Sequence, residues 1–134
     1  MLLASCKEYE PIIRCQVNGT EVLIEGNGTV LAQYVNMGGG FVRSSVGGDN
    51  GNTSVNIRFD GNTPGNYSCG LSASGVIDVY HNGQSYTTDE TGGSGNINVV
   101  QAGNNLIEGY FSGSLWSGTE EMVVTDGMFS GRAY

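Results

Sequence analysis

Glycine and asparagine recur in short clusters along the chain and divide it into strand-like runs. The sequence has 23 glycines among 134 residues and only 2 prolines. Both Gly and Asn tolerate a positive φ, so these clusters supply tight turns. Glycine inside a helix costs about 1 kcal/mol relative to alanine, and no window of the sequence keeps a helical period. We therefore expect short strands joined by tight turns.

Local patterns support this expectation. Asn18-Gly19 lies between two strand-like runs and predicts a type I′ β-hairpin. Residues 53–60 alternate strictly between apolar and polar side chains, which is typical of a half-buried strand. Residues 106–116 predict a long strand that places Ile107, Gly109, Phe111, Gly113 and Leu115 on one face. We expect the apolar side chains of these strands and of residues 96–101 to point into a core: Val55, Ile57, Phe59, Ile97, Val99, Ile107, Phe111 and Leu115.

Roughly ten such runs, with turns every 8–12 residues, predict an all-β fold. We expect a two-sheet β-sandwich, with a closed β-barrel as the alternative. The interior glycines Gly109 and Gly113 favour the sandwich because they permit bends and close packing. The length fits one domain, over residues 14–134. No run of 18 or more apolar residues predicts a membrane-spanning helix.

The first residues carry a localisation signal. Leu3-Ala4-Ser5-Cys6 resembles a bacterial lipobox, in which an aliphatic residue and two small residues precede an acylated cysteine. We expect Cys6 to be the lipid anchor and residues 1–13 to form a lipobox remnant and tether. The protein would then be held at the outer membrane or cell surface, outside the cytoplasm. A chance match of a short apolar segment is the alternative.

Charge excludes some partners. The chain has 5 Lys and Arg against 13 Asp and Glu, a net charge of −8. So few cations cannot form a track for phosphates, which disfavours nucleic acid. Anionic lipid headgroups are disfavoured for the same reason.

Two cysteines remain once Cys6 is assigned to the anchor. In an oxidising compartment, Cys15 and Cys69 are expected to form a disulfide. It would close a loop of 69 − 15 = 54 residues and contribute about 4 kcal/mol in the chain-entropy model. Two free buried thiols are the alternative.

The sequence contains no convincing set of catalytic residues, and we expect that the protein is not an enzyme. His81 is the only histidine and lies in a predicted turn, where a solvent-exposed role is commoner than a catalytic one. No cofactor is expected, although calcium is possible. Candidate calcium ligands are the turn residues Asp49, Asn50, Asn52 and Asp60. Ordinary turn chemistry explains the same residues.

Aromatic residues suggest a ligand site. Carbohydrate binding needs an exposed aromatic platform with polar neighbours, and the candidates are Trp116, Tyr80 and Tyr86. The alternative places Trp116 in the core at the end of a strand.

The chain resembles small Bacteroidetes surface lipoproteins of unknown function. The likeness rests on an acidic segment after Cys6 and on turn and core segments along residues 14–130, namely 15–19, 63–67, 107–115 and 122–129. The chain departs from these relatives at Cys15, where they more often have an apolar residue. The resemblance implies a lipid-anchored β-domain and carries no activity.

Together these observations predict a non-enzymatic, surface-anchored binding or interaction module with a protein or glycan partner. The alternative is a structural subunit that self-assembles into an extracellular filament by β-strand addition, with residues 10–17 as the donated strand. A carbohydrate-binding module is the third hypothesis.

Overall fold

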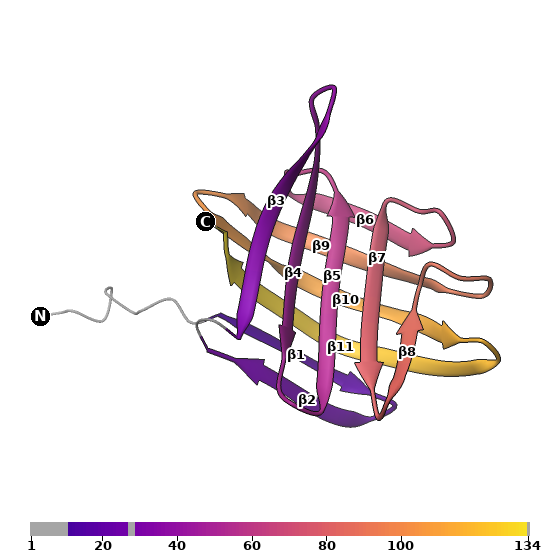
Figure 1. Ribbon diagram of the computed structural model, residues 1–134. Coiled ribbons are helices and arrows are strands. Elements are labelled where there is room, and N and C mark those ends of the chain that lie inside the picture. The colour runs from indigo at the N-terminus through magenta and orange to yellow at the C-terminus, as the bar shows by residue number, and fades with distance from the viewer. Residues whose placement is uncertain (1–10, 27–28, 134) are drawn as a thin grey trace, which may run out of the picture.

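The computed structural model describes residues 11–26 and 29–133, and its regular structure is entirely β (Figure 1). The all-β prediction is confirmed. In the described part of the chain, no helix is long and apolar enough to cross a membrane. The eleven strands are β1 (Ile12–Val17), β2 (Thr20–Glu25), β3 (Val30–Gly38), β4 (Phe41–Asp49), β5 (Thr53–Asp60), β6 (Gly65–Gly70), β7 (Gly75–His81), β8 (Gln84–Thr87), β9 (Ser94–Gly103), β10 (Leu106–Ser117) and β11 (Glu120–Arg132).

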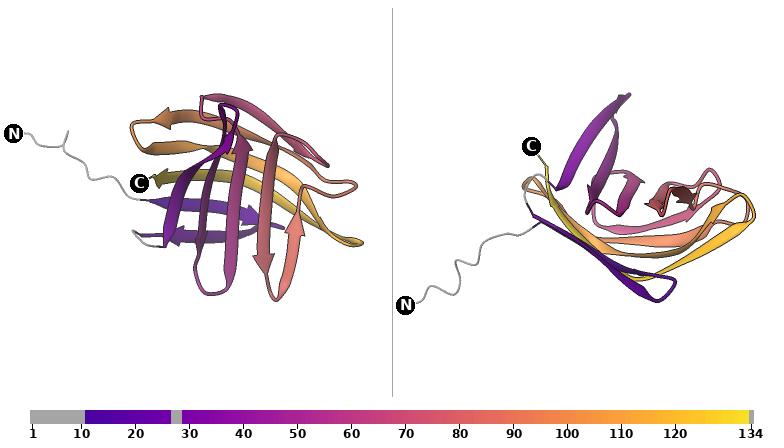
Figure 2. Two further views of the ribbon diagram at one scale, coloured as in Figure 1. Left: turned by 45° about the horizontal axis from the view of Figure 1, so that its top comes forward. Right: turned by 60° about the horizontal axis from the view of Figure 1, so that its bottom comes forward.

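The strands form two layers that belong to one hydrogen-bonded sheet. The strand order is β2-β1-β11-β10-β9-β6-β7-β5-β4-β3, and β8 pairs with both β7 and β10. Figures 1 and 2 show β3, β4, β5, β7 and β8 running across the face of the other six strands. The layers connect where β6 meets β7 through the parallel pair Cys69 and Gly75, and again where β8 meets β10 at Thr87 and Trp116. The predicted pair of sheets is thus a single sheet folded over itself.

The sheet stays open. Its order ends at β2 and β3, which do not pair with each other along their described residues. One isolated bridge joins Ala32 of β3 to Ala133 after β11. The layered arrangement of a sandwich therefore describes the fold better than the closed barrel.

The first strand begins earlier than expected. Residues 12 and 13 were predicted to belong to the tether, but β1 starts at Ile12, and Ile13 is completely buried. β1 pairs with β2 on one side and with β11 on the other. Donating residues 12–17 to a neighbouring molecule would therefore break two ladders. Residue 10 lies outside the described residues.

The first hairpin follows the local sequence. Asn18 and Gly19 have φ angles of 49° and 86°, as a type I′ turn requires at both central positions. The Asn18 side chain also accepts a hydrogen bond from the Val123 backbone N–H at 2.8 Å. This contact ties the β1–β2 turn to β11.

The core lies between the layers, and the predicted register is confirmed. All eight side chains expected to point inward are buried. Phe59 of one layer packs against Tyr67 of the other, with ring centroids 4.6 Å apart. Phe111 packs against Phe129 at 6.1 Å. Aromatic side chains from both layers therefore fill a shared interior.

Truncating the core should lower stability sharply. Phe59→Ala and Phe111→Ala should each cost about 3–5 kcal/mol, because the removed ring leaves a cavity in a packed core. Thermal unfolding followed by circular dichroism measures the effect. Tyr110→Ala, at the exposed neighbour of Phe111, is the control and should change stability by only about 0.5 kcal/mol. Phenylalanine variants that melt like the wild type would contradict this core.

Candidate functional site

A hollow lies on the outer face of the layer formed by β3, β4, β5, β7 and β8. Its volume is about 500 Å³. Side chains on this face alternate along each strand with the buried residues of the core, so the core register decides which residues reach the hollow.

Strand pairing aligns one residue from each strand across the hollow. Leu31 lies opposite Gly47, Gly47 opposite Asn56, and Asn56 opposite Asp78. Asp78 in turn lies opposite Thr87 of β8. All five residues line the hollow. They form a row across the five strands, about 19 Å long at the usual spacing of strands.

Glycine opens the middle of this row. A Cβ atom at Gly47 would lie 2.7 Å from Oδ1 of Asn56 and 3.4 Å from the carbonyl oxygen of Val55. Even alanine at Gly47 would therefore press on the Asn56 amide. Because Gly47 has no side chain, the hollow is deeper beside Asn56.

Two exposed side chains with apolar surface border the hollow. Leu31 on β3 is 57% exposed, and Tyr80 on β7 is 51% exposed. Tyr80 lies opposite Ser54 on one side and Ser85 on the other, one row away from Asp78. An exposed aromatic ring with hydroxyl neighbours can hold the apolar face of a ligand while the hydroxyls bond its polar edge.

The polar groups of the hollow have unused hydrogen-bonding capacity. The side chains of Asn56 and Asp78 bond no other described residue. Asp49 accepts a hydrogen bond from the Ser54 hydroxyl at 3.0 Å. The lining includes no Lys, Arg or His. The hollow therefore offers an amide, two carboxylates and several hydroxyls to a ligand, without a cation.

The three predicted ligand-binding aromatics lie in different environments. Tyr80 is exposed in the hollow. Tyr86 also borders it, but its side chain is buried and its hydroxyl donates to Gln84 Oε1 at 3.1 Å. Trp116 does not line the hollow. Its indole Nε1 donates to the carbonyl oxygen of Gly92 at 3.0 Å, which fastens the loop before β9 to β10. Tyr80 alone fits the expected platform.

The residues that the prediction missed are Asn56 and Asp78. Asn56 is a polar member of an alternating strand, so its outward direction could be read from the sequence. Its pairing with Asp78 could not, because β7 follows β5 only after the excursion through β6.

The predicted calcium ligands lie at two separate turns. Asp49, Asn50 and Asn52 lie at the β4–β5 turn, where Asn50 Oδ1 accepts the backbone N–H groups of Asn52 and Thr53 at 2.9 Å. Asp60 lies at the far end of β5 and is ion-paired with Arg43 at 2.8 Å.

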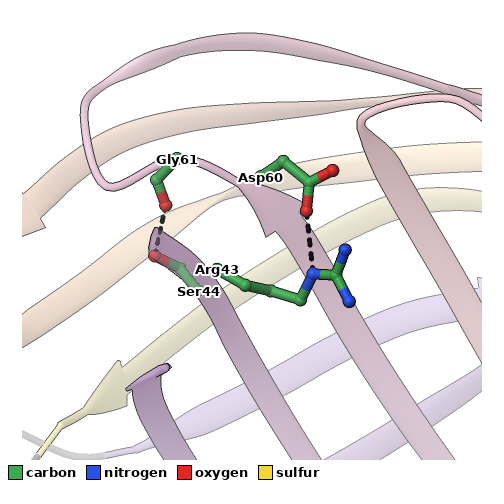
Figure 3. Close-up of polar contacts among 4 residues, drawn as sticks. All are labelled: Arg43, Ser44, Asp60 and Gly61. Atoms are coloured by element: carbon green, nitrogen blue, oxygen red, sulfur yellow. Dashed lines mark hydrogen bonds and ion pairs between the residues drawn. The ribbon is translucent and has the colours of Figure 1, made fainter. Parts of the chain in front are cut away.

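Figure 3 shows the Asp60–Arg43 pair beside the hydrogen bond from the Ser44 hydroxyl to the Gly61 carbonyl. β5 separates Asp60 from the turn by roughly 20 Å at the rise of a strand. In the described part of the chain, no three His, Cys, Asp or Glu side chains gather as a metal site. The candidate ligands thus lie at two separate turns, and calcium binding at either turn stays a prediction.

The predicted disulfide is wrong. Cys15 and Cys69 are both buried and free. Cys15 lies on β1 and Cys69 on β6, and β11, β10 and β9 lie between these strands. Four strand spacings correspond to about 19 Å, well beyond the roughly 7 Å limit for two Cα atoms. The alternative of two buried thiols describes the structure.

Cys6, the predicted lipid anchor, lies outside the described residues.

No family model, curated protein or solved structure matched the chain in the comparisons with known proteins.

Thiol counting tests the assignment of the two buried cysteines. In a Cys6→Ser variant, unfolded without reductant, a thiol reagent should titrate two groups per chain. In the folded protein at pH 8 the reaction should be slow, because burial raises the pKa of Cys15 and of Cys69 to about 11 and the thiolate is the reactive form. Fewer than two thiols in the unfolded protein would indicate an oxidised pair.

Proposed function

We propose that this protein is a non-enzymatic binding module, held outside the cytoplasm at the outer membrane or cell surface by acylated Cys6. Its ligand site is the hollow on the outer face of β3, β4, β5, β7 and β8. The observation that carries the proposal is the exposed Tyr80 ring beside Asn56 and Asp78, whose side chains bond no other described residue.

The ligand that this chemistry suits best is a neutral carbohydrate. A sugar ring has an apolar face that can stack on Tyr80, and vicinal hydroxyls that can bond Asn56 and Asp78 together. The lining has no cation to hold a phosphate or carboxylate. The net charge of −8 also repels anions at long range. A neutral, hydroxyl-rich ligand avoids both penalties.

A cationic ligand is the competing explanation. Asp49 and Asp78 are both negative, and an ammonium group is attracted to the face of a tyrosine ring. However, Asp49 already accepts the Ser54 hydroxyl, whereas Asn56 offers a neutral amide that suits a hydroxyl. Neutralising Asp78 separates the two explanations, since only a cation depends on its charge.

Removing the Tyr80 ring should weaken carbohydrate binding. We expect one member of a panel of neutral hexasaccharides built from glucose, mannose or N-acetylglucosamine to bind in calorimetry. Tyr80→Ala should weaken that binding about tenfold, or ~1.4 kcal/mol, because the apolar sugar face loses its platform. Tyr110→Ala, which removes a similarly exposed tyrosine from the opposite layer, is the matched control and should leave binding unchanged.

Asp78→Asn should retain part of the hexasaccharide binding, because the amide still bonds a hydroxyl. A wild-type protein that binds spermidine but no hexasaccharide, and loses the spermidine binding in Asp78→Asn, would show that the ligand is a cation and not a carbohydrate. Equal losses in Tyr80→Ala and Tyr110→Ala would contradict this location of the site.

The anchor is tested separately. In a bacterial host that processes lipoproteins, wild-type protein should incorporate labelled palmitate and fractionate with membranes. Cys6→Ala should appear in the soluble fraction, because the acyl chains supply the membrane affinity. Wild-type protein without label would contradict the anchor and leave the binding site unaffected.

A further inference from the structure

A second hollow lies on the outer face of the other layer. Its volume is about 790 Å³, and it lies over β1, β9, β10 and β11. The residues that matter for its chemistry are Arg14, Asn98, Tyr110, Asp126 and Met128. It shares no lining residue with the proposed carbohydrate site.

A bulge in β11 shapes this hollow. The pairing of β10 with β11 shifts between Phe111 and Gly113, and the pairing of β1 with β11 shifts between Arg14 and Gln16. Asp126 lies in this bulge with a φ of 53°, in the left-handed region. Bulges of this kind redirect a side chain and often border functional sites. Here the redirected side chain is the carboxylate of Asp126.

Arg14 provides the opposite charge. Its guanidinium donates from Nη2 to the sulfur of Met128 at 3.4 Å, which draws it over the neighbouring strand. A guanidinium has five N–H donors, and a thioether is a weak acceptor. Arg14 makes no ion pair with Asp126 or with any other described carboxylate. One cation and one anion thus border the same hollow without neutralising each other.

Tyr110 supplies an apolar surface on β10, next to the strand that carries Asp126. It is 56% exposed and lies opposite Asn98 on one side and Met128 on the other. Since Met128 is also opposite Arg14, the row Asn98, Tyr110, Met128 and Arg14 crosses four adjacent strands. A ligand resting on Tyr110 would therefore have the guanidinium two strands away, or roughly 10 Å between backbones, within reach of a long arginine side chain.

We propose that this hollow binds a free amino acid in its zwitterionic form. The carboxylate bonds the guanidinium of Arg14, which matches it geometrically. The ammonium group bonds Asp126, and an apolar side chain packs on Tyr110. A zwitterion has no net charge, so the net charge of −8 does not repel it as it would an anion. This site does not depend on the carbohydrate proposal.

Blocked amino acids test both charges at once. The probes are phenylalanine, N-acetylphenylalanine, which lacks the ammonium, and phenylalanine amide, which lacks the carboxylate. Amide shifts of isotope-labelled protein measure each dissociation constant. We expect phenylalanine to bind at least about tenfold more tightly than either blocked form. Equal binding of N-acetylphenylalanine or of glucuronate would overturn the proposal in favour of a simple carboxylate site, and no binding of phenylalanine would overturn it altogether.

Two variants locate the charges. Arg14→Gln and Asp126→Asn should each weaken phenylalanine binding at least about tenfold. Asparagine tolerates the left-handed backbone at residue 126 as well as aspartate does, so Asp126→Asn should keep the bulge. Tyr80→Ala, on the opposite layer, is the control and should bind phenylalanine like the wild type. Unchanged affinity in both charge variants would overturn the assignment.

Discussion

The fold depends on one constraint: a single sheet must bury its apolar face against itself. The fold line is the junction of β6 and β7, where Cys69 and Gly75 form a parallel pair. A Cβ atom at Gly75 would lie 3.1 Å from the Cys69 sulfur, so glycine permits this close approach. Once the sheet turns here, Phe59 meets Tyr67 across the layers. Neither layer could bury its apolar side alone.

Both candidate sites are consequences of the same constraint. Strand side chains alternate, so burying Val55, Ile57 and Val79 leaves Asn56 and Asp78 on the outer face. An outer face becomes a site only where its surface is interrupted. Gly47 lowers the surface of the layer formed by β3, β4, β5, β7 and β8, because it has no side chain. The bulge at Asp126 shapes the outer surface of the other layer. Each face then presents an exposed tyrosine beside polar groups.

Local patterns in the sequence predicted local structure well, and failed where the answer depended on strand order. Alternation at residues 53–60 fixed the inward register of β5, and Asn18-Gly19 fixed the first turn. Strand order is a long-range property, so the sequence placed Cys15 near Cys69 although three strands separate them. For the same reason the alternation at residues 53–60 indicates that Asn56 faces away from the core, but not that it lies opposite Asp78. Of the three aromatic candidates, only Tyr80 is exposed, because Tyr86 points into the core and Trp116 is partly buried against the loop before β9.

We propose that the ligand binds to the outer face of the layer formed by β3, β4, β5, β7 and β8, and not to an edge of the sheet. The most direct measurement is a residue-by-residue map of amide shifts while labelled protein is titrated with the neutral hexasaccharide that binds most tightly. We expect the largest shifts on β5 and β7 around Asn56, Asp78 and Tyr80, with β10 and β11 unchanged. Largest shifts along the edge strand β2, or across β10 and β11, would contradict it.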